Sequence, residues 1–157
     1  MGWKKDFDTQ LSLLGHRNWI LVVDKAYPVQ IGDGVEMIDT GENFIHVVNY
    51  VMAAVAGAPH VKPSYYLDEE FNYMSEDLAA GFDKVKDFIV TALGDKVASI
   101  PHEQLLVEKI DAASKLYKIL ILKTECVIPY TSLFIELGCG YWPDDNEAVL
   151  REKMINK

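Results

Sequence analysis

Residues 14–28 read LGHRNWILVVDKAYP, and this stretch decides the fold. The apolar run from Trp19 to Val23 is typical of a buried strand. His16 lies just before the run, and Asp24 follows it directly. The stretch therefore predicts a buried strand bracketed by an acid/base residue and a carboxylate. Whether these two groups share a pocket decides most of what they can do.

Further strands are expected at short apolar runs along the chain, and helices at apolar residues that recur every three to four positions. The first helix is predicted over about 4–14, and the second between a start signal at 39–41 and Gly57. A third is predicted over about 75–93, with Leu78 on its inner stripe. A fourth begins at Pro101, with Leu105, Leu106 and Ile110 facing inward. The strands are predicted at 35–38, 65–67, 97–100, within 116–122, and at 133–137, and the tail is weakly helical over 146–154.

Strands that alternate with helices favour an α/β domain. We predict a single three-layer α/β/α domain of 157 residues around a central mixed, mostly parallel sheet. The last two strands have a short connection, which favours an antiparallel pair. Ligands gather at the carboxyl ends of strands in such sheets, where Asp24 and His102 are expected.

The net charge of −9 argues against nucleic-acid binding, because the chain has no basic stripe to contact phosphates. No apolar run reaches the length of a membrane span, and no signal-peptide pattern opens the sequence. Two cysteines make no disulfide framework, so we expect reduced thiols and a cytoplasmic protein.

Four side chains could carry chemistry, and each also has a purely structural interpretation. The intrinsic pKa of histidine lies near neutrality, so His16 could transfer protons, or it could cap a loop carbonyl. Asp24 could orient an imidazole or bind a hydroxyl, or it could close a turn. His102 could act at the strand end or simply open a helix. Tyr130 could donate to a sugar or phosphate oxygen, or it could pack at the sheet edge.

Motifs for cofactors are missing from the sequence. The histidines and cysteines lack metal-ligand spacing such as C-x-x-C or H-E-x-x-H, and neither a Walker loop nor G-x-G-x-x-G occurs. This pattern favours a reaction without cofactor or metal, in which only protons move.

Two blocks of residues resemble one known family. Gly15-His16, the apolar run, Asp24 and Pro28 form the first block. His102-Glu103-Gln104, Glu125-Cys126 and Pro129-Tyr130 form the second. In order and spacing both are similar to the ribose pyranase and fucose mutarotase family, over about residues 9–140.

The resemblance implies roles for individual residues. His16 matches the family's proton donor, and Asp24, His102 and the segment Tyr130-Thr131-Ser132 match its sugar-binding positions. The family usually has asparagine where this chain has Ser132, which offers one hydroxyl in place of an amide. Lys25 also departs from the family's small residue, and could pair with Asp24 or point to solvent.

The family interconverts ring forms or anomers of a free aldose and assembles as rings, pentamers or decamers, with sites between subunits. The resemblance thus implies a cofactor-free mutarotase or pyranase that opens a hemiacetal by acid/base catalysis. His16, held in one tautomer by a carboxylate such as Asp24 or by a carbonyl, would be the donor. A non-catalytic sugar-binding or transport-associated module on the same scaffold remains an alternative. An isomerase of phosphorylated sugars is a weaker one, since Arg17 is the only nearby arginine for a phosphate clamp.

Overall fold

The computed structural model describes residues 2–157 and is built around one six-stranded sheet in the order β2-β5-β1-β6-β3-β4. β1 (Trp19–Val23) lies in the middle of the sheet with every residue buried, as its apolar run predicts. The other strands are β2 (Val35–Asp39), β3 (Val61–Asp68), β4 (Val97–Ile100), β5 (Ile119–Lys123) and β6 (Leu133–Cys139).

Strand direction in the sheet is mixed but mostly parallel. β1 pairs in parallel with β5, β5 with β2, and β3 with β4, whereas β6 is antiparallel to both of its neighbours, β1 and β3. The predicted reversal of direction between the last two strands is therefore present. The two strands are not hydrogen-bonded neighbours, however, because β1 lies between them in the sheet.

The two faces of the sheet carry separate apolar cores, which confirms the three-layer α/β/α class. Ile20 and Val22 of β1 pack into the core under α1 (Trp3–Leu11), α2 (Phe44–Ala56) and α3 (Phe82–Leu93). Trp19, Leu21 and Val23 alternate onto the other face. Helical residues 102–114 cover that second face with the buried Leu105 and Ile110.

The second-face helix is continuous but changes its pitch. It consists of α4 (His102–Gln104), a π-helical stretch over Leu105–Asp111 and α5 (Ala112–Ser114). Its start directly after β4 agrees with the sequence, and it brings His102 to the end of that strand. Short 3₁₀ turns follow β3 (Glu69–Tyr73) and α3 (Gly94–Lys96).

α3 begins later than the apolar spacing predicts. Residues 75–81 form turns, and Leu78 is 70% exposed rather than on an inner stripe. The Glu76 carboxylate accepts hydrogen bonds from the backbone N–H groups of Gly81 and Asp83, and Gly81 has a φ of 91°. The left-handed Gly81 interrupts the helical backbone, so the helix can begin only at Phe82. The Glu76 carboxylate caps this start by accepting the two free N–H groups.

α2 also starts a few residues beyond its expected signal. The Thr40 hydroxyl donates to the carbonyl of Lys123 rather than capping a helix. The Asn43 side chain accepts the backbone N–H of His46 and is the actual N-cap.

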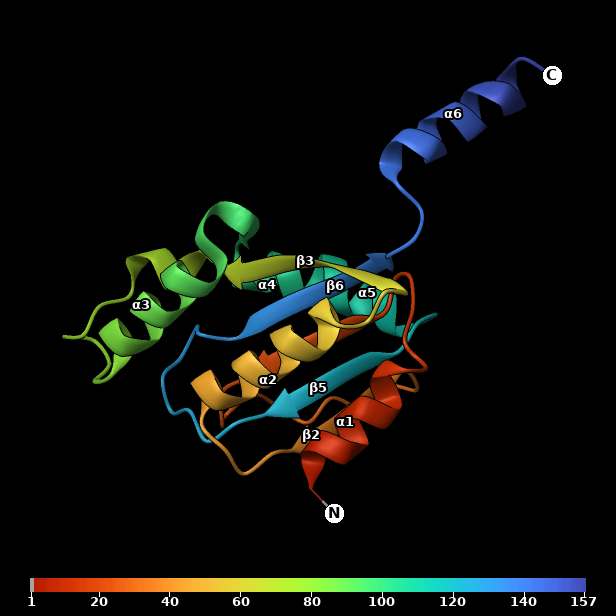
Figure 1. Ribbon diagram of the computed structural model, residues 1–157. Helices are drawn as coiled ribbons and strands as arrows, with labels where there is room; N and C mark the ends of the chain where they lie inside the picture. The colour runs from red at the N-terminus through yellow and green to blue at the C-terminus, as the bar shows by residue number, and fades with distance from the viewer. Residues whose placement is uncertain (1) are drawn as a thin grey trace.

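The C-terminal helix α6 (Asp144–Ile155) projects away from the sheet (Figure 1), and none of its residues is buried. Within residues 2–157, no helix combines the length and the apolar character that crossing a membrane requires.

Candidate functional site

His16 lies on a tight turn between α1 and β1. The Asn18 carboxamide closes this turn: its oxygen accepts the Gly15 N–H at 2.7 Å, and its nitrogen donates to the Lys118 carbonyl at 3.2 Å. Arg17 has a φ of 76°, in the left-handed region that non-glycine residues rarely adopt. The turn thus presents an exposed His16, and no hydrogen bond to its ring is found among residues 2–157.

The surroundings of His16 form a hollow of about 660 Å³ at the amino end of β1. Part of its lining comes from the C-terminal segment, including Trp142, Glu147 and Arg151. The Glu147 carboxylate accepts from Trp142 Nε1 at 2.8 Å and from Arg151 Nε at 2.7 Å. The hydrogen bond from Trp142, followed by the one from Arg151, lowers the pKa of Glu147. The indole ring of Trp142 and the exposed ion pair of Glu147 with Arg151 therefore line the same hollow as His16.

Asp24 lies at the opposite, carboxyl end of β1. The Ser132 hydroxyl, at the entry to β6, donates to Asp24 Oδ1 at 3.3 Å. Ser132 is only 3% exposed, whereas Asp24 is half-buried and keeps contact with solvent. Two of the predicted sugar-binding residues are therefore in direct contact.

His102 is the most firmly held of the predicted residues. Its backbone N–H donates to Glu70 Oε1 at 2.9 Å, and its ring Nδ1 lies 2.8 Å from Oδ1 of Asp68, the last residue of β3. The Asp68 side chain is 1% exposed and that of His102 30%. Burial raises the pKa of Asp68 to about 6 against the opposing effect of the hydrogen bond from His102.

Tyr130 and Thr131 face in different directions. Tyr130 has a φ of 61°, is 39% exposed, and meets the edge of the His102 ring with centroids 5.6 Å apart. Thr131 is fully buried, and its hydroxyl donates to the Ile128 carbonyl at 2.9 Å. The Thr131 side chain therefore holds the loop that carries Tyr130, and a substrate contact of Thr131 stays a prediction.

A buried phenol, Tyr27, lies behind this cluster. Burial, followed by the negative charges of Asp68 and Asp24, raises the pKa of Tyr27. It is 5% exposed and belongs to the apolar core on the second face of the sheet.

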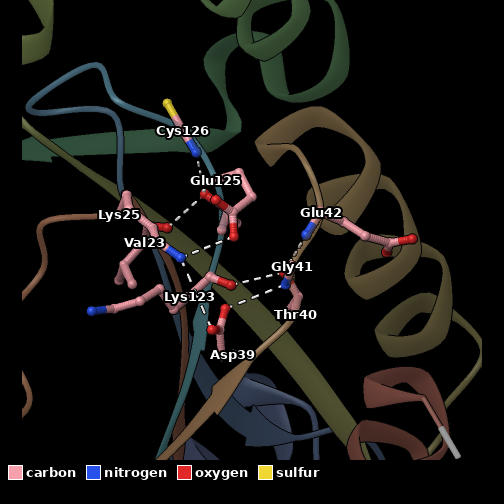
Figure 2. A network of polar contacts seen from close by, with 10 residues as sticks. Val23, Lys25, Asp39, Thr40, Gly41, Glu42, Lys123, Glu125 and Cys126 are labelled. Atoms are coloured by element: carbon pink, nitrogen blue, oxygen red, sulfur yellow. Dashed lines mark hydrogen bonds and ion pairs between the residues drawn. The ribbon is translucent and has the colours of Figure 1, made fainter.

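Lys25 is turned away from Asp24. Its Nζ lies 2.9 Å from Glu125 and 4.0 Å from Asp39, in the polar network of Figure 2. The same network includes the bond from the Thr40 hydroxyl to the Lys123 carbonyl. Lys25 thus joins the ends of neighbouring strands and leaves the Asp24 carboxylate available.

The predicted residues divide between the two ends of the sheet. Asp24, His102, Tyr130 and Ser132 meet at the carboxyl edge, while His16 lies beyond the amino end of β1. Because a strand advances about 3.3 Å per residue, the length of β1 separates His16 from Asp24. The expectation that Asp24 sets the tautomer of His16 is therefore wrong within one chain, and no backbone carbonyl of residues 2–157 takes that role.

Asp68 and Glu70 were not identified from the sequence. Residues 68–74 combine acidic and aromatic side chains without clear periodicity. A signal was nevertheless present, since Asp68 ends a strand as Asp24 does, and the carboxyl-end rule applies equally to both.

Comparison with known proteins gives a consistent result at the level of structure alone. No family model matches the chain, and no curated protein sequence matches it significantly. RbsD from Bacillus subtilis, solved in complex with D-ribose, aligns over 85% of this chain and 91% of its own at 19% identity, with a TM-score of 0.55. FucU from Bifidobacterium longum aligns over 85% and 94% at 16% identity, with a TM-score of 0.55.

The chain has the fold of the ribose pyranases and fucose mutarotases. A third structure, the fucose mutarotase of Streptococcus pneumoniae in complex with L-fucose, aligns over 85% of this chain and 91% of its own at 13% identity, with a TM-score of 0.51. The resemblance seen in the two sequence blocks is thus confirmed for the fold.

Proposed function

We propose that this protein is a cofactor-free isomerase that interconverts ring forms or anomers of a free aldose. The observation that carries the proposal is the cluster of Asp24, His102, Tyr130 and Ser132 at the carboxyl edge of a sheet whose structural neighbours bind D-ribose and L-fucose. Carboxylates, imidazoles and hydroxyls are suitable partners for sugar hydroxyls.

The chemistry needs two proton transfers. Opening a cyclic hemiacetal removes a proton from the anomeric hydroxyl, breaks the bond between the anomeric carbon and the ring oxygen, and protonates that oxygen. Ring closure reverses these steps on the other face of the carbonyl or from another hydroxyl. Positioned acid/base groups accelerate such steps by about 10²–10⁴-fold. We assign His16 as the donor to the ring oxygen.

We further propose that the site forms between copies of this chain, in a cytoplasmic ring of the pentameric or decameric kind. Two observations support it: His16 is exposed with no bond to its ring among residues 2–157, and the length of β1 separates it from Asp24. A neighbouring copy could bring its His16 to the carboxyl edge of the first, as the closed symmetry of a ring allows.

Saturation-transfer NMR on ribose, fucose and galactose tests the activity directly. We expect faster exchange between ring forms with the protein than with buffer, and a loss of about 10²-fold or more in His16→Ala. His46→Ala is the matched control, because His46 is an exposed histidine on α2 whose ring lies 3.3 Å from Glu42. A parent protein that accelerates no aldose contradicts the proposal, and a His16→Ala rate equal to that of the parent removes His16 from the mechanism.

A second candidate function is sugar binding without catalysis. Ser132 favours it, because its single hydroxyl is already bonded to Asp24 and offers less to a sugar than the family's asparagine amide. Titration calorimetry that shows aldose binding by a protein without exchange activity would establish this alternative.

A further inference from the structure

We propose that Asp68 and His102 form a proton-transfer pair that acts together with His16, in which Asp68 is a positioning residue and His102 is the base for the anomeric hydroxyl. The inference rests on the proposed isomerase function and adds a role to each residue. The juxtaposition that carries it is a carboxylate at the end of β3, 1% exposed, bonded at 2.8 Å to an imidazole that remains 30% exposed.

Three contacts hold His102, one at its backbone and two at its ring. Glu70 holds its backbone N–H, Asp68 holds Nδ1, and Tyr130 packs against its edge. An ionised carboxylate only accepts hydrogen bonds, so a charged Asp68 places the proton on Nδ1 and leaves the lone pair on Nε2. Nε2 has no partner among residues 2–157, and it is the nitrogen free to take a proton.

A purely structural role explains Asp68 poorly. A buried carboxylate is costly to keep charged, and its single side-chain partner within residues 2–157 is a histidine that reaches the surface. The other titratable groups facing the pair are Glu70, Asp24, Tyr27 and Tyr130. None of them is a cation, so the His102 imidazole is the side-chain donor that the described residues give to the buried Asp68 carboxylate.

The proton balance closes without a co-reactant. Neutral His102 takes the anomeric hydroxyl proton at Nε2 as the bond from the anomeric carbon to the ring oxygen breaks, and His16 of the adjoining copy protonates that oxygen. The product is the open-chain aldehyde. On closure, His102 returns its proton to the aldehyde oxygen while the attacking hydroxyl gives its proton to His16. Both histidines end in their starting state.

The sharpest test compares Asp68→Asn with His102→Gln and the double variant. Asparagine keeps the size of Asp68 and can still accept from Nδ1, but it lacks the charge. We expect each single variant to reduce kcat by about 10²-fold with little change in KM, and the double variant to be no worse than His102→Gln. Losses that multiply, or an Asp68→Asn variant with the parental kcat, would overturn the proposal. Asp39→Asn, an exposed carboxylate at the end of β2, is the matched control.

The pH profile separates positioning from a structural effect. Since burial raises the pKa of Asp68 to about 6, parental kcat should fall as the pH drops through that value, because Asp68 then loses its charge. This acid limb should be absent from Asp68→Asn. An identical limb in both proteins would exclude Asp68 as its source.

Nitrogen-15 NMR of His102 gives a readout that does not depend on activity. We expect a proton on Nδ1 in the parent at pH 7.5, with a shift toward the mixed tautomers of a free imidazole in Asp68→Ala. An unprotonated Nδ1 in the parent would overturn the pair even if the protein is an isomerase. A protonated Nδ1 in a protein that accelerates no aldose would retain the geometry but remove the catalytic role together with the proposed function.

Discussion

The two histidines of the candidate site are held in opposite ways at the two ends of the sheet. His16, before β1, lies exposed on a turn, and the bonds that shape this turn are made by Asn18 rather than by the imidazole. His102, after β4, is held by Asp68, Glu70 and Tyr130. The carboxyl edge is thus held by hydrogen bonds within one chain, whereas the amino end presents an exposed imidazole that has no hydrogen bond to its ring among residues 2–157. Under the proposed function, proton transfer between the two ends would use His16 of one copy and His102 of another.

Mixing two inactive variants gives the largest expected effect and tests this division. His16→Ala and His102→Ala should each be nearly inactive. Equal amounts, mixed under conditions that allow subunit exchange, should recover about one quarter of the parental rate, since random pairing gives that share of sites with both histidines. The measurement is ring-form exchange by NMR. Each variant incubated alone is the control, and a mixture no faster than either component would place both histidines in the same chain.

The pH dependence of stability gives the next largest effect and is confined to the carboxyl edge. Asp68 has a pKa of about 6 in the folded protein, above its usual value of 3.8. The folded state therefore binds more protons than the unfolded state between these values, and the free energy of unfolding falls as pH rises through this range. A shift of about two pKa units corresponds to about 3 kcal/mol.

Asp68→Asn should remove this loss, so its stability relative to the parent should improve by about 3 kcal/mol between pH 4 and 7. Urea unfolding at several pH values measures the difference, and Asp39→Asn controls for loss of a negative charge at the same sheet edge. If the free energy of unfolding of Asp68→Asn and of the parent changed with pH in the same way, ionisation of Asp68 would not destabilise the folded protein. A variant that is more stable but slower would be the expected result of a charge retained for catalysis.

The contrast between the two ends also explains what could be foreseen from the sequence. The run from Trp19 to Val23 predicted β1 with its observed bounds, because a central strand buried on both faces must be continuously apolar. The rule for strand ends then located Asp24 and His102 at one edge. It could not decide which side chains touch, since the contact of Ser132 with Asp24 joins residues 108 positions apart.

The failures have local causes of the same kind. Leu78 fits the helical stripe, but the Glu76 carboxylate caps the backbone five and seven residues later and delays the helix. Asp68 was missed because its partner, His102, lies 34 residues away across the β3–β4 pair. The position of β1 between β5 and β6 likewise depends on tertiary packing rather than on connection length.

Two asparagines offer the finest test of the comparison, with the smallest expected effect. Asn18 makes both bonds that close the His16 turn, at 2.7 and 3.2 Å, whereas the exposed Asn72 donates to the Ser99 hydroxyl near the carboxyl edge at 3.1 Å. Asn18→Ala should cost about 1–2 kcal/mol of stability, because the part-buried Gly15 N–H and Lys118 carbonyl lose their partner. Asn72→Ala should change stability by less than about 0.5 kcal/mol. If His16 acts from this turn, Asn18→Ala should also slow exchange severalfold, while Asn72→Ala should leave the exchange rate unchanged; an Asn18→Ala variant with the parental exchange rate would contradict a role of this turn in placing His16.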